Sequence, residues 1–295
     1  MKKTVIGLDI GGSTTKIVGW TEKELIAPMF VSATDPLTSA YGAFGKFTSE
    51  NGIALSDIEC VRMTGVGSAY INPPIYGVPC IPVSEFTCAG LGGLYSTGLD
   101  RAIVVSMGTG TALIYAQRGK EMRYLGGTGV GGGTLMGLSK KLLGVDSMES
   151  IVELASCGDL NNIDLMISDI TRPDLMPGMA MDMTASNFGK ISDLATKEDL
   201  ALGIFNMVFE SIGMLAVFAS RQFGVRDIVL TGNLSSVPQA KKTFDALNKM
   251  FDVNFVIPDN AGFATVIGAA ISGETTRRKK KAEKEKESSE KGLLS

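Results

Sequence analysis

The sequence predicts an α/β protein composed of two related lobes with duplicated phosphate-binding hairpins. The first observation is an alternation of short apolar strands and helices that continues from residue 4 to about residue 272. The second is an internal repeat, because the segments IGLDIGGSTTKIVGW and IVVSMGTGTALIYAQ share one pattern of apolar strand, glycine-rich turn and apolar strand. The third is composition: 295 residues with 44% hydrophobic and 20% charged side chains can bury a full core.

The first half of the chain contains four expected strands and one expected helix. Residues 4–10 and 15–20 are apolar strands joined by the tight turn GGST. Shorter strands are expected at residues 60–66 and 80–83, and a helix over residues 85–95.

The second half repeats this organisation with longer helices. Two strands surround the turn MGTGT, a glycine loop follows, and two later strands enclose a helix before a final glycine-spaced helix near residue 262. The expected strands are residues 102–106, 112–117, 227–233 and 253–258, the glycine loop is 126–133, and the expected helices are 134–143, 147–157, 238–250 and a long one that begins at 199.

The repeat also predicts the domain organisation. It places an N-terminal lobe at residues 1–100 and a C-terminal lobe at residues 101–274, which we expect to close on one nucleotide. Residues 275–295 form a charged, flexible tail with eight basic and four acidic side chains, an interleaved pattern typical of a solvated segment. Without this tail the body has a formal charge of −7, which argues against a nucleic-acid partner.

The apolar segment of residues 199–224 is long enough to be considered as a membrane span. Glu210 lies in its middle with Asn206 nearby, and an unpaired charge there would be costly in a bilayer. Asp199 and Gly224 look like an N-cap and a C-terminal glycine. We therefore expect a helix buried in a domain core or a subunit interface, no membrane partner, and a homodimer formed through this helix.

The absence of histidine excludes several classes of enzyme. No catalytic triad with histidine, no histidine-ligated zinc and no proximal haem histidine can exist in this chain. The four cysteines form no CxxC pair, and the N-terminus lacks the pattern of a signal peptide. These features predict a cytoplasmic protein with reduced thiols.

The first glycine turn, DIGGSTTK (9–16), carries the groups of a phosphate-binding hairpin. Asp9 ends an apolar strand, where its carboxylate could hold Mg²⁺ through water. Lys16 adds a positive charge on the return strand. The backbone and hydroxyl donors of the turn come from Gly11, Gly12, Ser13 and Thr14.

Three later segments are further candidates for nucleotide binding. The turn SMGTGT repeats the first hairpin, the run GGTGVGGGT precedes a helix whose N-terminus could bind an anion, and TGN could approach adenosine. The candidate residues are Gly108, Thr109, Gly110 and Thr111 in the second hairpin, Gly131, Gly132 and Gly133 in the glycine loop, and Gly232 and Asn233 in TGN.

DIGGSTTK together with RYLGGTGVGGGTLMGLSKKLLG (123–144) resembles the type II, eukaryotic-like pantothenate kinases. The resemblance continues through ASNFGK (185–190), VLTGN (229–233) and GFATVIGAA (262–270). It implies the two-lobed actin-like ATPase (ribonuclease H-like) fold of the superfamily that unites acetate kinase, sugar kinases and actin. It also implies transfer of the ATP γ-phosphate to the primary hydroxyl of pantothenate, the first step of coenzyme A synthesis, with Mg²⁺.

The same resemblance assigns roles to individual residues. Glu85 in PVSEF matches the family's catalytic base, and Arg123 matches its arginine before the glycine run. Thr109 matches the hydroxyl residue of the second phosphate loop, and Lys16 would stabilise the transferring group. Inhibition by CoA or acyl-CoA is left open.

Two other functions remain open at this point. IGLDIGGSTTK, VRMTGVGSAY and PVSEFTCAG also resemble the ATPase activators of 2-hydroxyacyl-CoA dehydratases, which hold an iron–sulfur cluster with two cysteines from each chain. Cys88 matches one such ligand, but no cysteine occurs from residue 89 to 156. A non-catalytic protein that binds nucleotide or acyl-CoA is the third interpretation.

Overall fold

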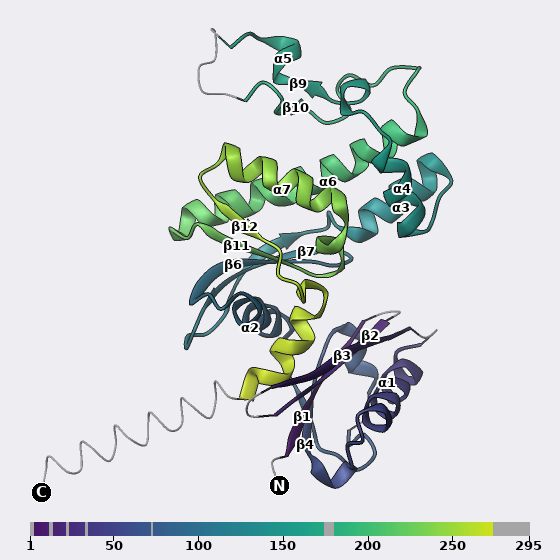
Figure 1. Ribbon diagram of the computed structural model, residues 1–295, viewed down its shortest axis with the longest axis vertical. Coiled ribbons are helices and arrows are strands. Elements are labelled where there is room, and N and C mark those ends of the chain that lie inside the picture. The colour runs from purple at the N-terminus through teal and green to yellow at the C-terminus, as the bar shows by residue number, and fades with distance from the viewer. Residues whose placement is uncertain are drawn as a thin grey trace, which may run out of the picture. The chain divides into compact units, whose positions relative to one another are not determined.

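The computed structural model describes residues 3–11, 14–21, 24–32, 35–71, 73–173 and 180–273, and its chain divides into two compact units (Figure 1). Unit 1 comprises Met1–Val104, Ile114–Tyr124 and Pro258–Ser295, and unit 2 comprises Val105–Leu113 and Leu125–Ile257. The boundary of the functional lobes near residue 100 stays a prediction, and the tail of residues 275–295 lies outside the described residues.

Unit 1 is built on a five-stranded sheet with the order β3-β2-β1-β4-β5. The first three strands are antiparallel neighbours, whereas β4 lies parallel to β1 and β5 lies parallel to β4. These strands are β1 (Thr4–Ile10), β2 (Thr14–Trp20), β3 (Leu25–Ser32), β4 (Ile58–Thr64) and β5 (Cys80–Pro82).

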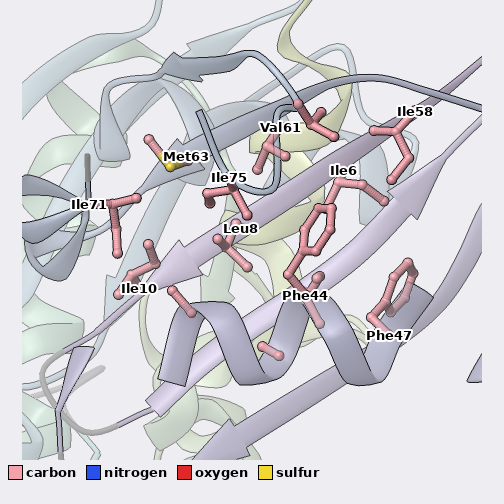
Figure 2. Packing of buried hydrophobic residues seen from close by; sticks show 14 residues of the cluster. Ile6, Leu8, Ile10, Phe44, Phe47, Ile58, Val61, Met63, Ile71 and Ile75 are labelled. Carbon is pink, nitrogen blue, oxygen red and sulfur yellow. The ribbon is translucent and has the colours of Figure 1, made fainter. Parts of the chain in front are cut away.

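The two faces of β1 are buried by different helices, because successive side chains of a strand point to opposite faces. Ile6, Leu8 and Ile10 pack with Phe44 and Phe47 of α1 (Pro36–Glu50), as Figure 2 shows.

The opposite face of β1 meets the helix of residues 264–273. Val5 packs with Val266 and Ala270 of this helix. A Cβ at Gly7 would lie 2.5 Å from the carbonyl oxygen of Val266, so the glycine allows the helix backbone to approach the strand. Asp9 follows the same alternation and therefore belongs to this second face.

α2 (Glu85–Thr97) and the helix of residues 264–273 are in backbone contact. A Cβ at Gly92 would lie 1.7 Å from the carbonyl oxygen of Ala264, and a Cβ at Gly268 would lie 1.8 Å from that of Cys88. No side chain fits at either position, and the pair of glycines thus determines how closely the two helices cross.

A second five-stranded sheet has the order β12-β11-β6-β7-β8. Starting from β3 in one sheet and β8 in the other, both sheets place their strands in the order third, second, first, fourth, fifth. This repeated topology confirms the duplication predicted from the two hairpins. The strands are β6 (Arg101–Met107), β7 (Thr111–Gln117), β8 (Arg123–Thr128), β11 (Asp227–Thr231) and β12 (Asn254–Val256).

Unit 2 contains the long helix α6 (Lys197–Phe223), which contacts α3, α4, α7 and β11. α6 meets the usual length and hydropathy criteria for a membrane span, yet 61% of its apolar window is buried within the protein. The other helices of this unit are shorter: α3 (Gly132–Leu143), α4 (Met148–Ser156), α5 (Ile167–Ile170) and α7 (Pro238–Met250). The unit also has a small antiparallel pair formed by β9 (Leu165–Met166) and β10 (Thr184–Ser186).

The start of α6 corrects one detail expected from the sequence. Thr196, not Asp199, is the N-cap, and its hydroxyl accepts from the amide of Asp199. Asp199 in turn accepts from the amide of Thr196, which completes a capping box.

Five 3₁₀ turns complete the described chain. They are η1 (Leu55–Asp57), η2 (Val66–Tyr70), η3 (Leu160–Asn162), η4 (Asn233–Ser236) and η5 (Ala261–Phe263).

Candidate active site

Asp9 lies at the carboxyl end of β1 between two polar residues of neighbouring strands. It is opposite Lys16 in the antiparallel β1–β2 pair and opposite Thr64 in the parallel β1–β4 pair. Residues paired in register share one face of a sheet. The sheet therefore places an ammonium group on one side of the carboxylate and a hydroxyl group on the other.

Electrostatic coupling shows that three predicted site residues come together in unit 1. Burial raises the pKa of Asp9 to about 6; the charge of Lys16 opposes this rise and the charge of Glu85 adds to it. Burial also lowers the pKa of Lys16, against the attraction of Asp9. Asp9, Lys16 and Glu85 are referred to below as the charged cluster, because Asp9 and Lys16 are register partners and the charge of Glu85 acts on Asp9.

Lys16 is held by the segment that precedes the helix of residues 264–273. Its Nζ donates a hydrogen bond to the carbonyl oxygen of Gly262 and lies 5.9 Å from the ring centroid of Phe263. The GF pair of GFATVIGAA therefore orients the lysine, a role that sequence reasoning did not assign to it.

The first glycine hairpin is packed against η2 through glycines that sequence reasoning missed. The amide of Gly11 donates to the carbonyl of Thr14 at 2.8 Å and closes the hairpin, while Gly12 and Ser13 lie outside the described residues. Gly65 has φ +84°, and a Cβ there would lie 2.6 Å from Oδ1 of Asp9.

A Cβ at Gly67 would lie 2.9 Å from the carbonyl oxygen of Gly11. Gly65 and Gly67 therefore let the backbone that follows β4 touch both the carboxylate and the hairpin.

Glu85 is the first residue of α2, and its side chain is exposed. Phe86 stacks on Tyr124 with ring centroids 4.0 Å apart and an interplanar angle of 14°. One turn further along α2, a Cβ at Gly90 would lie 2.9 Å from the sulfur of Met122. These two contacts hold the segment that contains Arg123 along the helix that carries Glu85.

The donor set around Asp9 fits a hydrated magnesium ion. The part of the chain that the structure describes holds no group of three or more His, Cys, Asp or Glu side chains that could bind a metal. Mg²⁺ keeps several waters and needs only one or two carboxylates when phosphates supply the remaining oxygens. Its charge would favour the ionised form of Asp9, which burial disfavours.

In unit 2, the second hairpin and the glycine loop are joined by backbone hydrogen bonds. The amide of Gly132 donates to the carbonyl of Gly108 at 2.8 Å, and the amide of Gly133 donates to that of Thr109 at 2.8 Å. The hydroxyl of Thr111 donates to the carbonyl of Val130 at 2.9 Å. The two loops thus form a single surface.

These bonds change the interpretation of the glycine loop. The amides of Gly132 and Gly133 begin α3, and both already have carbonyl partners in the hairpin. A Cβ at Gly131 would lie 2.7 Å from the carbonyl oxygen of Thr109. The glycines are therefore needed for close packing of two loops, and direct contact of Gly131, Gly132 and Gly133 with phosphate stays a prediction.

TGN joins the same surface of unit 2. Gly232 has φ +89°, and a Cβ there would lie 2.4 Å from the carbonyl oxygen of Met107. Asn233 then begins η4, and Leu234 lies beside Gly132, whose Cβ would be 3.7 Å from the Leu234 side chain. The second hairpin, the glycine loop and TGN are therefore neighbours.

A buried polar network that sequence reasoning missed joins ASNFGK to α6. Asn206 donates to Asp164 at 2.8 Å and to the hydroxyl of Thr184 at 3.2 Å. Thr184 and Asn187 donate to the two carboxylate oxygens of Glu210, at 2.8 and 2.9 Å. Burial raises the pKa of Glu210, and these hydrogen bonds oppose the rise.

Cys88, the candidate ligand for an iron–sulfur cluster, is buried on α2. Burial raises the pKa of its thiol to about 12, so the thiolate needed to bind a metal is disfavoured. All four cysteines, Cys60, Cys80, Cys88 and Cys157, are free thiols.

The repeated sheet, with a glycine hairpin after the first strand of each copy, defines an ATPase fold of the actin-like class. Solved structures support this class. Component A of the (R)-2-hydroxyglutaryl-CoA dehydratase of Acidaminococcus fermentans aligns with a TM-score of 0.64 at 18% identity, over 93% of this chain and 99% of that one. A ROK family glucokinase from Streptomyces griseus aligns with a TM-score of 0.55 at 14% identity, over 90% and 98%. At these identities the likeness shows the fold alone.

Within this class, the sequence model of the family described as Fumble matches residues 101–271. This match covers more than half of the chain, and the chain belongs to that family. A type II pantothenate kinase from Bacillus cereus (strain G9842) is 29% identical over 288 residues, which is 92% of this chain and 98% of the relative. One from Staphylococcus aureus (strain MRSA252) is 28% identical over 280 residues, 91% and 99% respectively. The resemblance seen in the motifs is thereby confirmed.

Proposed function

We propose that the protein is an ATP-dependent kinase that phosphorylates the primary hydroxyl of pantothenate, the first step of coenzyme A biosynthesis. The observation that carries this proposal is the cluster of Asp9, Lys16 and Glu85 at the first glycine hairpin. It supplies an anion for a metal, a cation for a phosphate and a second carboxylate for a proton. The names of the relatives from Bacillus cereus and Staphylococcus aureus support pantothenate as the acceptor.

The chemistry requires one proton transfer and the stabilisation of a transferring phosphoryl group. Glu85, an exposed carboxylate at the start of a helix, accepts the proton of the acceptor hydroxyl as the hydroxyl oxygen attacks the γ-phosphorus. The bond from this phosphorus to the bridging oxygen breaks, and ADP leaves with that oxygen. Lys16, held by Gly262, stabilises the negative charge on the transferring group. Arg123 binds the acceptor or the developing charge.

The residues proposed to bind the nucleotide belong to the two hairpins and to TGN. Asp9 would hold Mg²⁺ through water, and this ion would neutralise charge on the phosphates. Gly11, Gly12, Ser13 and Thr14 bind phosphate in the first hairpin, and Gly108, Thr109, Gly110 and Thr111 do so in the second. Gly131, Gly132 and Gly133 support the second hairpin, and Gly232 with Asn233 approaches the adenosine.

We further propose a cytoplasmic homodimer that contacts its partner through α6. Free thiols at all four cysteines suit a reducing compartment. On α6, Leu215 and Phe218 are exposed by 40% and 56%, which leaves apolar surface on an otherwise buried helix. Inhibition by CoA or acyl-CoA stays open.

The activator of a dehydratase is not favoured as an alternative. The likeness to dehydratase component A is one of fold, and the buried thiol of Cys88 is poorly suited to an iron–sulfur cluster. Protein purified without oxygen would be brown if it held such a cluster, through iron–thiolate absorption.

Stimulation of ADP formation by pantothenate tests the proposal. The full chain is incubated with MgATP and a panel of small alcohols, and we expect pantothenate to raise the rate well above that of every other acceptor. An ATPase rate that pantothenate leaves unchanged would show that the acceptor is another molecule, or that the protein only binds nucleotide.

A further inference from the structure

In each of the two sheets, the fourth strand ends at a threonine that is followed by a glycine. Thr64 and Gly65 follow this pattern at the end of β4, and Thr231 and Gly232 follow it at the end of β11. Gly65 has φ 84° and ψ 156°, and Gly232 has φ 89° and ψ 173°, a backbone region that is essentially restricted to glycine.

The two glycines meet equivalent partners. A Cβ at Gly65 would lie 2.4 Å from the carbonyl oxygen of Ile10, the last residue of β1, and a Cβ at Gly232 would lie 2.4 Å from that of Met107, the last residue of β6. Thr64 and Thr231 are therefore equivalent positions of the duplicated fold.

The two threonine hydroxyls nevertheless differ in their hydrogen bonds. Thr231 is fully buried, and its hydroxyl donates to the carbonyl oxygen of Val105 at 3.3 Å. Thr64 is 2% exposed, and among the described residues its hydroxyl has no nitrogen or oxygen hydrogen-bond partner. A buried hydroxyl without a partner is destabilising, so its presence needs a reason beyond packing.

The surroundings of Thr64 indicate that reason. Asp9 is its register partner on β1, and both residues lie at the carboxyl ends of their strands. The hydroxyl also makes a hydrogen-bonding contact with the thiol of Cys88, which opposes the rise of the thiol pKa, but sulfur is only a weak hydrogen-bonding group. The strong acceptor beside Thr64 is thus the carboxylate assigned above to Mg²⁺.

We propose that Thr64 is a positioning residue for Asp9, whose hydroxyl donates a hydrogen bond to this carboxylate when MgATP is bound. Thr231 keeps the structural role at the equivalent position, whereas the hydroxyl of Thr64 has only the weak contact with the Cys88 thiol in the resting protein and turns to Asp9 in the bound state. A hydrogen bond to a metal-binding carboxylate orients it and commonly changes metal affinity by about 10- to 100-fold. This inference rests on the proposed function only in assigning Mg²⁺ and ATP to Asp9.

Three variants separate positioning from a structural role. Thr64→Val and Thr231→Val each remove one hydroxyl with almost no change in volume, and Thr64→Ser restores the hydroxyl at position 64. Without ligands, we expect Thr231→Val to lower the melting temperature by about 2–4 °C, because a buried hydrogen bond is lost. Thr64→Val should leave it unchanged or raise it, because the hydroxyl it removes has only a weak contact with the Cys88 thiol.

Calorimetric titration with ATP, in the presence and absence of Mg²⁺, provides the second readout. We expect Thr64→Val to weaken MgATP binding by about 10-fold or more and to leave metal-free ATP binding within about twofold. Thr64→Ser should restore MgATP affinity, and kcat should fall in Thr64→Val while the KM for pantothenate is unchanged.

Two results would overturn the inference: a loss of stability in Thr64→Val as large as that in Thr231→Val, or a normal affinity of Thr64→Val for MgATP. A failure of the proposed acceptor is distinguishable, because the unfolding and MgATP measurements contain no pantothenate.

Discussion

The contact between α2 and the helix of residues 264–273 predicts a strong effect of one added methyl group. In Gly92→Ala, the new Cβ would lie 1.7 Å from the carbonyl oxygen of Ala264. Ordinary contacts at such a position begin at 3.4 Å, so the two helices would have to separate by roughly 1.7 Å.

The magnitude follows from two opposing contributions. Overpacking of this kind costs about 3 kcal/mol, which is the upper end of the usual range, because the new Cβ clashes with a backbone atom. The higher helix propensity of alanine stabilises a helix interior by about 1 kcal/mol relative to glycine. We therefore expect Gly92→Ala to lose about 2 kcal/mol of unfolding free energy, which is roughly 4–8 °C in melting temperature.

Gly42→Ala on α1 is a matched control. It is the same substitution in a helix interior, but a Cβ at Gly42 meets no atom within 4 Å. Only the helix propensity changes there, and the variant should gain about 1 kcal/mol. Thermal unfolding of the two variants beside the unsubstituted protein measures the difference.

Activity gives an independent readout, because α2 carries Glu85 at its first position. A displacement of the helix by about 1 Å can reduce kcat by about 100-fold. If Gly92→Ala melted at a higher temperature, as Gly42→Ala should, and kept its activity, the close helix contact would not position the base.

Three further predictions follow from the sites. Gly65→Ala should lose MgATP binding, because its Cβ would lie 2.6 Å from Oδ1 of Asp9. The control Gly98→Ala also has a positive φ, +71°, but its Cβ meets no atom within 4 Å, so it should bind MgATP normally; equal affinities of the two variants would contradict this prediction. Burial raises the pKa of Asp9 to about 6, so its carboxyl is neutral below that pH. The affinity for MgATP should therefore fall by about tenfold per pH unit below about pH 6, whereas the affinity for metal-free ATP should not show this fall. Asn206→Leu should cost about 3 kcal/mol in denaturant unfolding, because buried Asp164 loses the amide that donates to it at 2.8 Å, and a loss below about 1 kcal/mol would count against the network.

The hairpins and the repeat were predictable because their signals are local. The alternation in β1 and the glycines of its turn determine a strand, a turn and a second strand within a few residues. The same signals recur at β6 and β7, and the structure gives both sheets one strand order. The position of Asp9 at a strand end follows directly from this pattern.

The elements that were not predicted include β3, β8 and α1, and α1 has a clear signal. β3 contains Pro28 and β8 contains two glycines, which weaken a strand pattern. α1 contains two glycines as well, yet Asp35 before Pro36 is a helix start, and apolar residues recur at Ala40, Ala43, Phe44 and Phe47. The N-cap at Asp35 therefore predicts the start of α1.

The parts of the site that could not be predicted depend on contacts between distant segments. The packing of Gly65 on Asp9 requires the parallel register of β1 and β4, which periodicity does not give. The amides of Gly132 and Gly133 look free in the sequence, but they donate to carbonyls in the second hairpin. The polar network likewise joins Asp164, which lies before β9, to Asn206 and Glu210 of α6.

Replacement of the proposed base tests the account most directly. Transfer of labelled γ-phosphate from ATP to pantothenate is measured for Glu85→Gln and for Glu149→Gln, which changes another exposed glutamate in the first turn of a helix. We expect Glu85→Gln to lower kcat by at least about 100-fold with ATP affinity within about twofold, and Glu149→Gln to be fully active. A Glu85→Gln protein that transfers phosphate at the normal rate would contradict the account.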